Sequence, residues 1–361
     1  MWATAAFRSR SRLPGSMAEA PGQSGVRVES FEAFMARALY DPNHGYYTCR
    51  IREVGPAGDF STSATLAPDL GIAMAEWLRR ESRVHAGIRN AIEAGPGTGA
   101  LSAVVRKELG FWERRRWNWH LVEASPVLRK RQQSVLGGSV TWHTTMEEAL
   151  AACGGEALIF HNELLDAFPV IRVEWRNNSW QEIWIEWDGA GRPREFLESL
   201  RIEPGDAYSV LRFRAAEGQR CELHRAAREW LQGWAPALRR GSVLAVDYGD
   251  EFPALYRRRL RGTVRAYLLQ ERSTEVYANV GQQDLTADVN FTDYNAWAAG
   301  LGWEHGGFQT QAEFLGALPV SPRRFWKRRA SEDLERSRFL RDPDGAGGAF
   351  RCVWHRKIPV V

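Results

Sequence analysis

The sequence predicts an α/β fold built on a mostly parallel sheet, and two observations carry this prediction. From about residue 89 onward, short apolar strands alternate with helical segments at the spacing of βαβ units. The first of these strands runs directly into a glycine-rich turn that ends at Gly99, and a helical pattern follows. Such a turn lets a ligand approach the backbone closely, while the helix points its first N–H groups at that ligand. We therefore expect a nucleotide-type cofactor at this turn.

The composition is that of a soluble globular protein. Of its 361 residues, 44% are hydrophobic and 25% are charged, and no apolar run is long enough to span a bilayer. A net charge of +4 is small for this length and does not indicate nucleic-acid binding. The four cysteines are far apart and the eight histidines lack metal-ligand spacing, so we predict no metal site.

Composition and pattern divide the chain into five segments. These are a disordered or targeting extension (1–28), an N-terminal helical and lid region (29–88), the cofactor-binding Rossmann-like core (89–169), a β-rich antiparallel insertion (170–221), and the remainder of the catalytic domain with the substrate side (222–361). Within the last segment, residues 308–314 are weakly strand-like.

The first sixteen residues contain arginines and no acidic residue, as mitochondrial transit peptides do. The alternative is that Met17 is the true start of the protein. We accordingly expect a cytoplasmic protein if the source is bacterial, and a protein of the mitochondrial matrix if residues 1–16 are a transit peptide.

Two acidic residues help to identify the cofactor. The turn from Gly95 to Ala100 can be read as a G-x-G-x-x-A dinucleotide fingerprint, with Glu123 as the acid that holds a ribose. Glu93, two residues before the first glycine, would repel a pyrophosphate. The same carboxylate would attract the ammonium and sulfonium groups of S-adenosylmethionine (SAM). We therefore predict SAM, with a nicotinamide-dependent oxidoreductase as the weaker alternative.

Several loops together also resemble a known family, the MidA-type methyltransferases, which include a mitochondrial complex I assembly factor reported to methylate a protein arginine. The motifs that carry the resemblance extend from about residue 31 to 320, in the family's order. They are Asp41-Pro-x-x-Gly45-Tyr46-Tyr47, Gly58-Asp59-Phe60-x-Thr62-Ser63, Glu93-x-Gly95-Pro96-Gly97-x-Gly99-x-Leu101, His120-Leu-Val-Glu123-x-Ser125, Asn162-Glu163-x-x-Asp166-Ala167-x-Pro169, Ala245-Val-Asp247-Tyr248-Gly249 and Gln283-Asp284-Leu-Thr286-Ala287-Asp288-Val289-x-Phe291. The resemblance implies a Rossmann-like class I methyltransferase fold and a protein substrate.

The resemblance and the chemistry of methyl transfer together assign site residues. An arginine acceptor needs carboxylates that orient its guanidinium and stabilise its charge, and these are expected just after the fourth core strand. The catalytic candidates are Glu163, Asn162 and Asp166. The expected cofactor-binding residues are Glu93, Gly95, Pro96, Gly97, Gly99 and Glu123, with Gly58, Asp59, Phe60 and Thr62 as a lid or wall. Asp284, Thr286, Asp288 and Phe291 would line the substrate side.

One departure from the family pattern keeps a second function open. Members of the family usually continue Thr-Ser with Pro-Glu-Ile-Ser, whereas this chain has Ala64-Thr65-Leu66-Ala67 and lacks that carboxylate. The first prediction is thus a SAM-dependent methyltransferase acting on a protein side chain, best matched by arginine. The alternative is a catalytically weak SAM-binding assembly or interaction protein of the same fold. The sequence does not indicate an oligomeric state.

Overall fold

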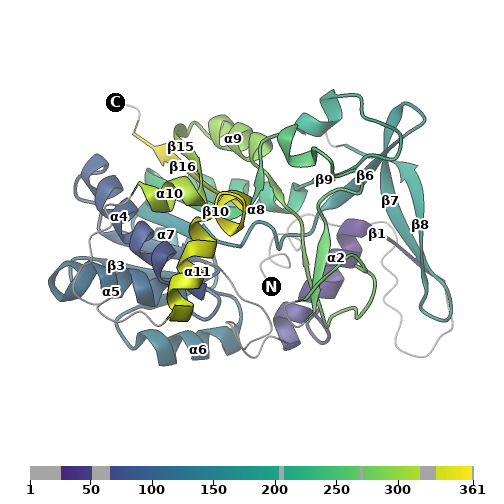
Figure 1. The fold of residues 1–361 in the computed structure, drawn as a ribbon. Coiled ribbons are helices and arrows are strands. Elements are labelled where there is room, and N and C mark those ends of the chain that lie inside the picture. The colour runs from purple at the N-terminus through teal and green to yellow at the C-terminus, as the bar shows by residue number, and fades with distance from the viewer. Residues whose placement is uncertain (1–25, 51–65, 203–206, 269–270, 318–330, 360–361) are drawn as a thin grey trace. The chain divides into compact units, whose positions relative to one another are not determined.

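The chain divides into two units, each assembled from separate stretches of sequence. The computed structural model describes residues 26–50, 66–202, 207–268, 271–317 and 331–359 (Figure 1). The first unit takes the described residues of Met1–Ile51, Ala167–Leu231 and Glu251–Asp293. The second takes those of Arg52–Asp166, Gln232–Asp250 and Tyr294–Val361. Helices α8 (Arg225–Trp234) and α9 (Phe291–Gly300) each cross a boundary between these stretches.

The second unit contains the predicted Rossmann-like sheet. Its strand order is β15-β16-β10-β5-β2-β3-β4. Strands β4, β3, β2, β5 and β10 pair in parallel, whereas β16 is antiparallel to both β10 and β15. The strands are β2 (Asn90–Ala94), β3 (Asn118–Val122), β4 (Thr141–His143), β5 (Glu156–Asn162), β10 (Arg240–Asp250), β15 (Glu304–Thr310) and β16 (Phe350–Lys357).

Amphipathic helices complete this unit. Their apolar faces and the buried strands share one hydrophobic core, to which Leu70, Trp77, Leu121, Phe160 and Val246 belong. The helices are α4 (Asp69–Val84), α5 (Ala100–Arg114), α6 (Pro126–Leu136), α7 (Met146–Ala152), α10 (Gln311–Gly316), α11 (Ser331–Arg341) and α12 (Ala346–Ala349), with a 3₁₀ turn η3 (Ala235–Ala237).

The segment expected to be strand-like at 308–314 is instead half strand and half helix. Strand β15 ends at Thr310, and α10 begins at the next residue. The Thr310 side chain accepts a hydrogen bond from the Glu313 N–H (3.1 Å), and the Glu313 carboxylate accepts one from the Thr310 N–H (2.8 Å). This reciprocal cap stabilises a helix start, which makes the strand prediction wrong over 311–314.

The first unit is built on antiparallel sheet, as predicted for the insertion. Strand β7 pairs with β6, β1 and β8, and β9 pairs with β6. A smaller sheet has the order β12-β11-β13, also antiparallel. The strands are β1 (Arg27–Ser30), β6 (Ile171–Arg176), β7 (Ser179–Trp187), β8 (Pro193–Ser199), β9 (Arg220–Leu223), β11 (Arg265–Leu268), β12 (Glu271–Ser273) and β13 (Asp284–Thr286). The two-residue strand β14 (Val289–Asn290) belongs to neither of these sheets.

The remaining elements of this unit are short. Helix α2 (Phe31–Tyr40) begins directly after its N-cap Ser30, whose hydroxyl accepts a hydrogen bond from the Ala33 N–H (3.2 Å). Phe34 on α2 lies 5.6 Å from the ring of Trp187 and 5.2 Å from that of Tyr277, between ring centroids. The others are a π-helical turn η1 (Tyr46–Arg50) and 3₁₀ turns η2 (Ser209–Arg212) and η4 (Ala254–Tyr256). Among the described residues of both units, we find no helix with the length and apolarity of a membrane span.

Candidate active site

The glycine turn between β2 and α5 has the open backbone that a ligand needs. Gly95 and Gly97 have left-handed φ values of 64° and 53°. A Cβ added at Gly95 would lie 2.8 Å from Cδ1 of Leu164, whereas one added at Gly97 would meet no atom of the described residues within 4 Å. The turn is thus packed against the protein at Gly95 and open at Gly97. Gly99 is the N-cap residue of α5, and Pro96 lies between the first two glycines.

Glu93 is buried at the end of β2 without a cationic partner among the described residues. Its carboxylate accepts a short hydrogen bond from the hydroxyl of Ser102 on α5. The indole N–H of Trp119 donates to the same hydroxyl (2.8 Å). Burial raises the pKa of Glu93 to about 8. A bound cation would favour the ionised form of this group.

Glu123 follows β3, and the side chain of Gln132 joins it to the glycine turn. Gln132 was not identified as a site residue from the sequence. The Glu123 carboxylate accepts hydrogen bonds from the Ser125 N–H (2.8 Å) and from Nε2 of Gln132 (3.2 Å). Gln132 Nε2 also donates to the Gly97 carbonyl (2.8 Å), and its Oε1 accepts from the indole of Trp142 (2.9 Å). Burial raises the pKa of Glu123 to about 7. Gln132 is the one buried residue of α6. A polar residue on the buried face of a helix is the signal that could have identified it.

The Asn162–Glu163 pair lies where β5 ends. Glu163 has a left-handed φ of 49°, which is uncommon for a residue with a side chain. The Asn162 amide donates to the Glu163 carboxylate (3.1 Å). The Asn162 Oδ1 atom is buried and has no hydrogen-bond partner among the described residues. Asp166, the third catalytic candidate, is buried at the end of the following turn.

Asp247 on β10 holds the turn that contains Glu163. One of its oxygens accepts hydrogen bonds from the N–H groups of Leu164 (3.1 Å) and Leu165 (2.8 Å), and the other accepts from Tyr248 (3.0 Å). Burial, with a smaller contribution from the charge of Glu163, raises the pKa of Asp247 to about 8. A strained backbone conformation persists only where the surrounding structure maintains it. Here the hydrogen bonds from Leu164 and Leu165 to Asp247 hold the turn that contains Glu163.

The expected substrate-side residues lie in the first unit. Asp284 and Thr286 are both on β13, two residues apart and therefore on one face. Asp288 forms ion pairs with Arg259 and Arg265, so its charge is already compensated. Phe291 begins α9 and is fully buried.

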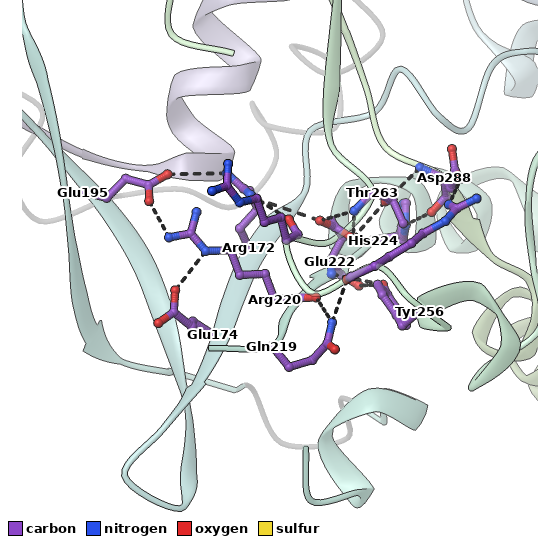
Figure 2. A network of polar contacts seen from close by, with 12 residues as sticks. Arg172, Glu174, Glu195, Gln219, Arg220, Glu222, His224, Tyr256, Thr263 and Asp288 are labelled. Carbon is purple, nitrogen blue, oxygen red and sulfur yellow. Dashed lines mark hydrogen bonds and ion pairs between the residues drawn. The ribbon is translucent and has the colours of Figure 1, made fainter. Parts of the chain in front are cut away.

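Asp288 belongs to a larger network of polar contacts (Figure 2). Its backbone oxygen lies 3.1 Å from a ring nitrogen of His224, and its N–H donates to the hydroxyl of Thr263. Thr263 also donates to the buried carboxylate of Glu222. Each of these carboxylates has partners within the unit, which favours a structural role for the network.

The expected lid residues Gly58, Asp59, Phe60 and Thr62 fall outside the described residues. Within the described ranges, no group of three or more histidine, cysteine, aspartate or glutamate side chains could hold a metal ion.

Two curated proteins are similar in sequence to this chain. A *Drosophila melanogaster* protein named "Protein arginine methyltransferase NDUFAF7 homolog, mitochondrial" is 28% identical over 290 residues, covering 72% of this chain and 64% of that protein. The *Danio rerio* protein of the corresponding name is 27% identical over 293 residues, covering 73% and 67%. The chain thus spans about two thirds of the length of these relatives, and slightly less in the first case.

A solved structure extends the likeness to the whole fold. A *Burkholderia thailandensis* protein crystallised with S-adenosyl-homocysteine is 25% identical, with a TM-score of 0.78, covering 91% of this chain and 88% of that one. A native structure from the same organism gives a TM-score of 0.75 at 24% identity. Together with the strand order, these likenesses confirm the predicted class I fold.

A family model described as an S-adenosyl-L-methionine-dependent methyltransferase matches residues 70–309. That range holds the glycine turn, Glu93, Glu123, the Asn162–Glu163 pair and Asp247. It confirms SAM over a nicotinamide as the cofactor expected from the sequence. The chain belongs to this family of SAM-dependent methyltransferases.

Proposed function

We propose that this protein transfers a methyl group from SAM to a protein side chain, with the guanidinium of an arginine as acceptor. The observation that carries the proposal is the position of Glu163, strained to a positive φ and held by Asp247 where β5 ends. Ligands of open α/β sheets bind outside the carboxyl ends of the strands. The names of the *Drosophila* and *Danio* relatives support arginine as the acceptor.

The residues present fit SAM. No described residue fills the space beside Gly97, so within that part of the chain its backbone is accessible. Glu93, buried without a cation among the described residues, suits the ammonium and sulfonium groups. A carboxylate has about four acceptor positions, so Glu123 keeps acceptor capacity for ribose hydroxyls beside its bonds to Ser125 and Gln132. When bound, SAM supplies a methyl group already activated by the sulfonium.

The protein's part in the reaction is to align the acceptor and manage its proton. A guanidinium has a pKa above ~12 and must lose a proton around the transfer, which the carboxylate of Glu163 would accept and pass to solvent. Glu163 would orient the guanidinium through charge-assisted hydrogen bonds and stabilise its developing charge. Asn162 fixes the Glu163 carboxylate through its amide. Alignment by such fixed groups can supply much of the rate.

The test is Glu163→Gln, which keeps the size of the side chain and removes its charge. We expect unchanged binding of S-adenosyl-homocysteine (SAH) by calorimetry and loss of methyl transfer to arginine-containing proteins. Glu147→Gln, at an exposed position in the same unit, is the matched control and should be fully active. Full activity in Glu163→Gln would remove this residue from the reaction. Stoichiometric SAH binding without any methylated product from the wild-type protein would favour the assembly-protein alternative.

We also propose a mitochondrial location. The relatives carry that location in their names, and the arginine-containing, acid-free residues 1–16 agree with a transit peptide. The intact mass of the native protein tests this: a chain that lacks these residues and comes from purified mitochondria supports the location.

A further inference from the structure

The motif Asp41-Pro-x-x-Gly45-Tyr46-Tyr47 is not among the residues assigned above to the cofactor, yet its geometry is highly specified. The Asp41 carboxylate accepts hydrogen bonds from the N–H groups of Asn43 and His44, both at 2.9 Å. A Cβ at Gly45 would lie 2.5 Å from the Asp41 nitrogen, so only glycine fits. This tight turn leads directly into η1, which begins at Tyr46.

The tyrosine that follows this turn, Tyr47, contacts the buried carboxylate of Asp284, which belongs to the motif of residues 283–291. The Tyr47 hydroxyl donates to Oδ1 of Asp284 on β13 (2.8 Å). The Tyr47 ring is stacked with the Tyr40 ring at 5.5 Å between centroids and 20° between planes. The two loops also touch through their backbones, because a Cβ at Gly281 would lie 2.1 Å from the His44 carbonyl oxygen.

Asp284 differs from other buried carboxylates of its unit. Glu29 is paired with Arg37 (2.6 Å), Glu174 with Arg220 (2.8 Å), and Asp288 with two arginines. Asp284 is buried with no ion pair among the described residues. Arg265, whose charge acts on Asp284, is ion-paired with Asp288 instead. A buried charge without a counter-ion is costly, and a ligand cation would relieve that cost.

Asp293 is a second buried carboxylate of this unit without an ion pair among the described residues. Both of its oxygens have donors, namely the Ser209 N–H (2.8 Å) and the Asn290 amide (3.1 Å). Asp284 likewise has donors, in the Tyr47 hydroxyl and the Leu285 backbone, but a polar group beside it lacks a partner among the described residues. Thr286, on the same face of β13, is 6% exposed, and its Oγ1 has no hydrogen-bond partner among the described residues.

We propose that Asp284, Tyr47 and the ring of Tyr40 form a subsite, within the first unit, that binds an arginine guanidinium of the protein substrate. The carboxylate supplies the counter-charge, the tyrosine rings supply faces that attract a cation, and Thr286 supplies a hydroxyl acceptor. This inference rests on the proposed function for the identity of its ligand. The two loop motifs then contribute residues to the same binding site.

The experiment is a titration of the full-length protein, saturated with SAH, with N-acetyl-arginine amide. The neutral isostere N-acetyl-citrulline amide serves as the comparison ligand, and line broadening of ligand NMR signals is the readout. We expect the arginine derivative to bind and the citrulline derivative to bind at least about tenfold more weakly. Asp284→Asn should weaken arginine binding about tenfold or more, because a charge-assisted contact is lost. Glu198→Gln, an exposed charge change in the same unit, should match the wild type.

A second variant keeps the inference testable if Asp284→Asn fails to fold. Tyr47→Phe removes only the hydroxyl that orients the carboxylate and should weaken arginine binding while leaving SAH affinity unchanged. Equal binding of arginine by wild-type and Asp284→Asn proteins, equal binding of citrulline, or no arginine binding by the wild type would each overturn the subsite. Methyl transfer is measured on the same samples. Asp284-dependent binding without any transfer would contradict the proposed function and leave the subsite standing.

Discussion

Replacing Gln132 by methionine tests how the cofactor site is held together. Methionine has a side chain of about the same size as glutamine, but it cannot form the hydrogen bonds of the Gln132 amide. The wild-type amide joins the Gly97 carbonyl to the Glu123 carboxylate, and it accepts the indole N–H of Trp142. We therefore expect two consequences, a lower stability and a glycine turn no longer aligned with the ribose-binding acid.

The magnitude follows from the three contacts. A neutral hydrogen bond contributes about 1 kcal/mol net, and one to a charged group about 1.5–3 kcal/mol. Gln132 is fully buried, so water cannot replace its hydrogen bonds in the protein interior. The buried apolar side chain of methionine recovers part of the lost stability through the hydrophobic effect. The free energy of unfolding should fall by about 3 kcal/mol. The affinity for SAH should fall about tenfold, which corresponds to about 1.4 kcal/mol.

Urea unfolding and calorimetric titration with SAH measure the two effects. The matched control is Gln133→Met, because Gln133 is the exposed neighbour on the same helix and the chemical change is identical. Stability within about 0.5 kcal/mol of this control, the usual range for surface substitutions, would refute the reasoning. So would an SAH affinity equal to that of the control, because the amide would then not align the site.

Two further predictions concern buried carboxylates. Burial raises the pKa of Glu93 from its ordinary 4.5 to about 8, so between these values the folded state holds a proton that the unfolded state has lost. Stability should fall as pH rises from about 4.5 to about 8, by on the order of 5 kcal/mol. Glu93→Gln should flatten this fall in urea unfolding at several pH values; an unchanged slope would contradict the assignment. Asp247→Asn should lower the kcat of methyl transfer about tenfold or more by releasing the Glu163 turn, while SAH affinity stays as in the exposed control Asp344→Asn.

Local patterns were sufficient for the core of the second unit. Parallel strands buried on both faces read as apolar runs, and β2, β5 and β10 show this in the sequence. Glycine-rich turns and helical periodicity then indicate the crossovers. The helix α10 was missed although its signal was present. Thr310 and Glu313 stand at capping-box spacing, but the apolar residues around them are equally compatible with a strand.

Long-range pairing was beyond the reach of these patterns. The N-terminal strand β1 pairs Arg27 with Trp187 and Ser30 with Trp184, which joins the start of the chain to the insertion. No local feature of residues 27–30 specifies a partner more than 150 positions away. The partners Gln132, Gly97 and Glu123 illustrate the same limit in the cofactor site, because three different segments supply them.

Glu163 shows most clearly why a site is harder to predict than a fold. A positive φ at a glutamate is unfavourable in isolation, so propensity argues against the observed conformation. It is maintained by Asp247, 82 positions from Leu165, which accepts hydrogen bonds from two consecutive N–H groups of the turn. The sequence nominated Glu163 as a site residue, because it follows a buried strand, whereas Asp247 entered only as part of a family motif. The carboxylate of Asp247 holds the backbone turn that orients Glu163, and this contact exists only after β5 and β10 have paired.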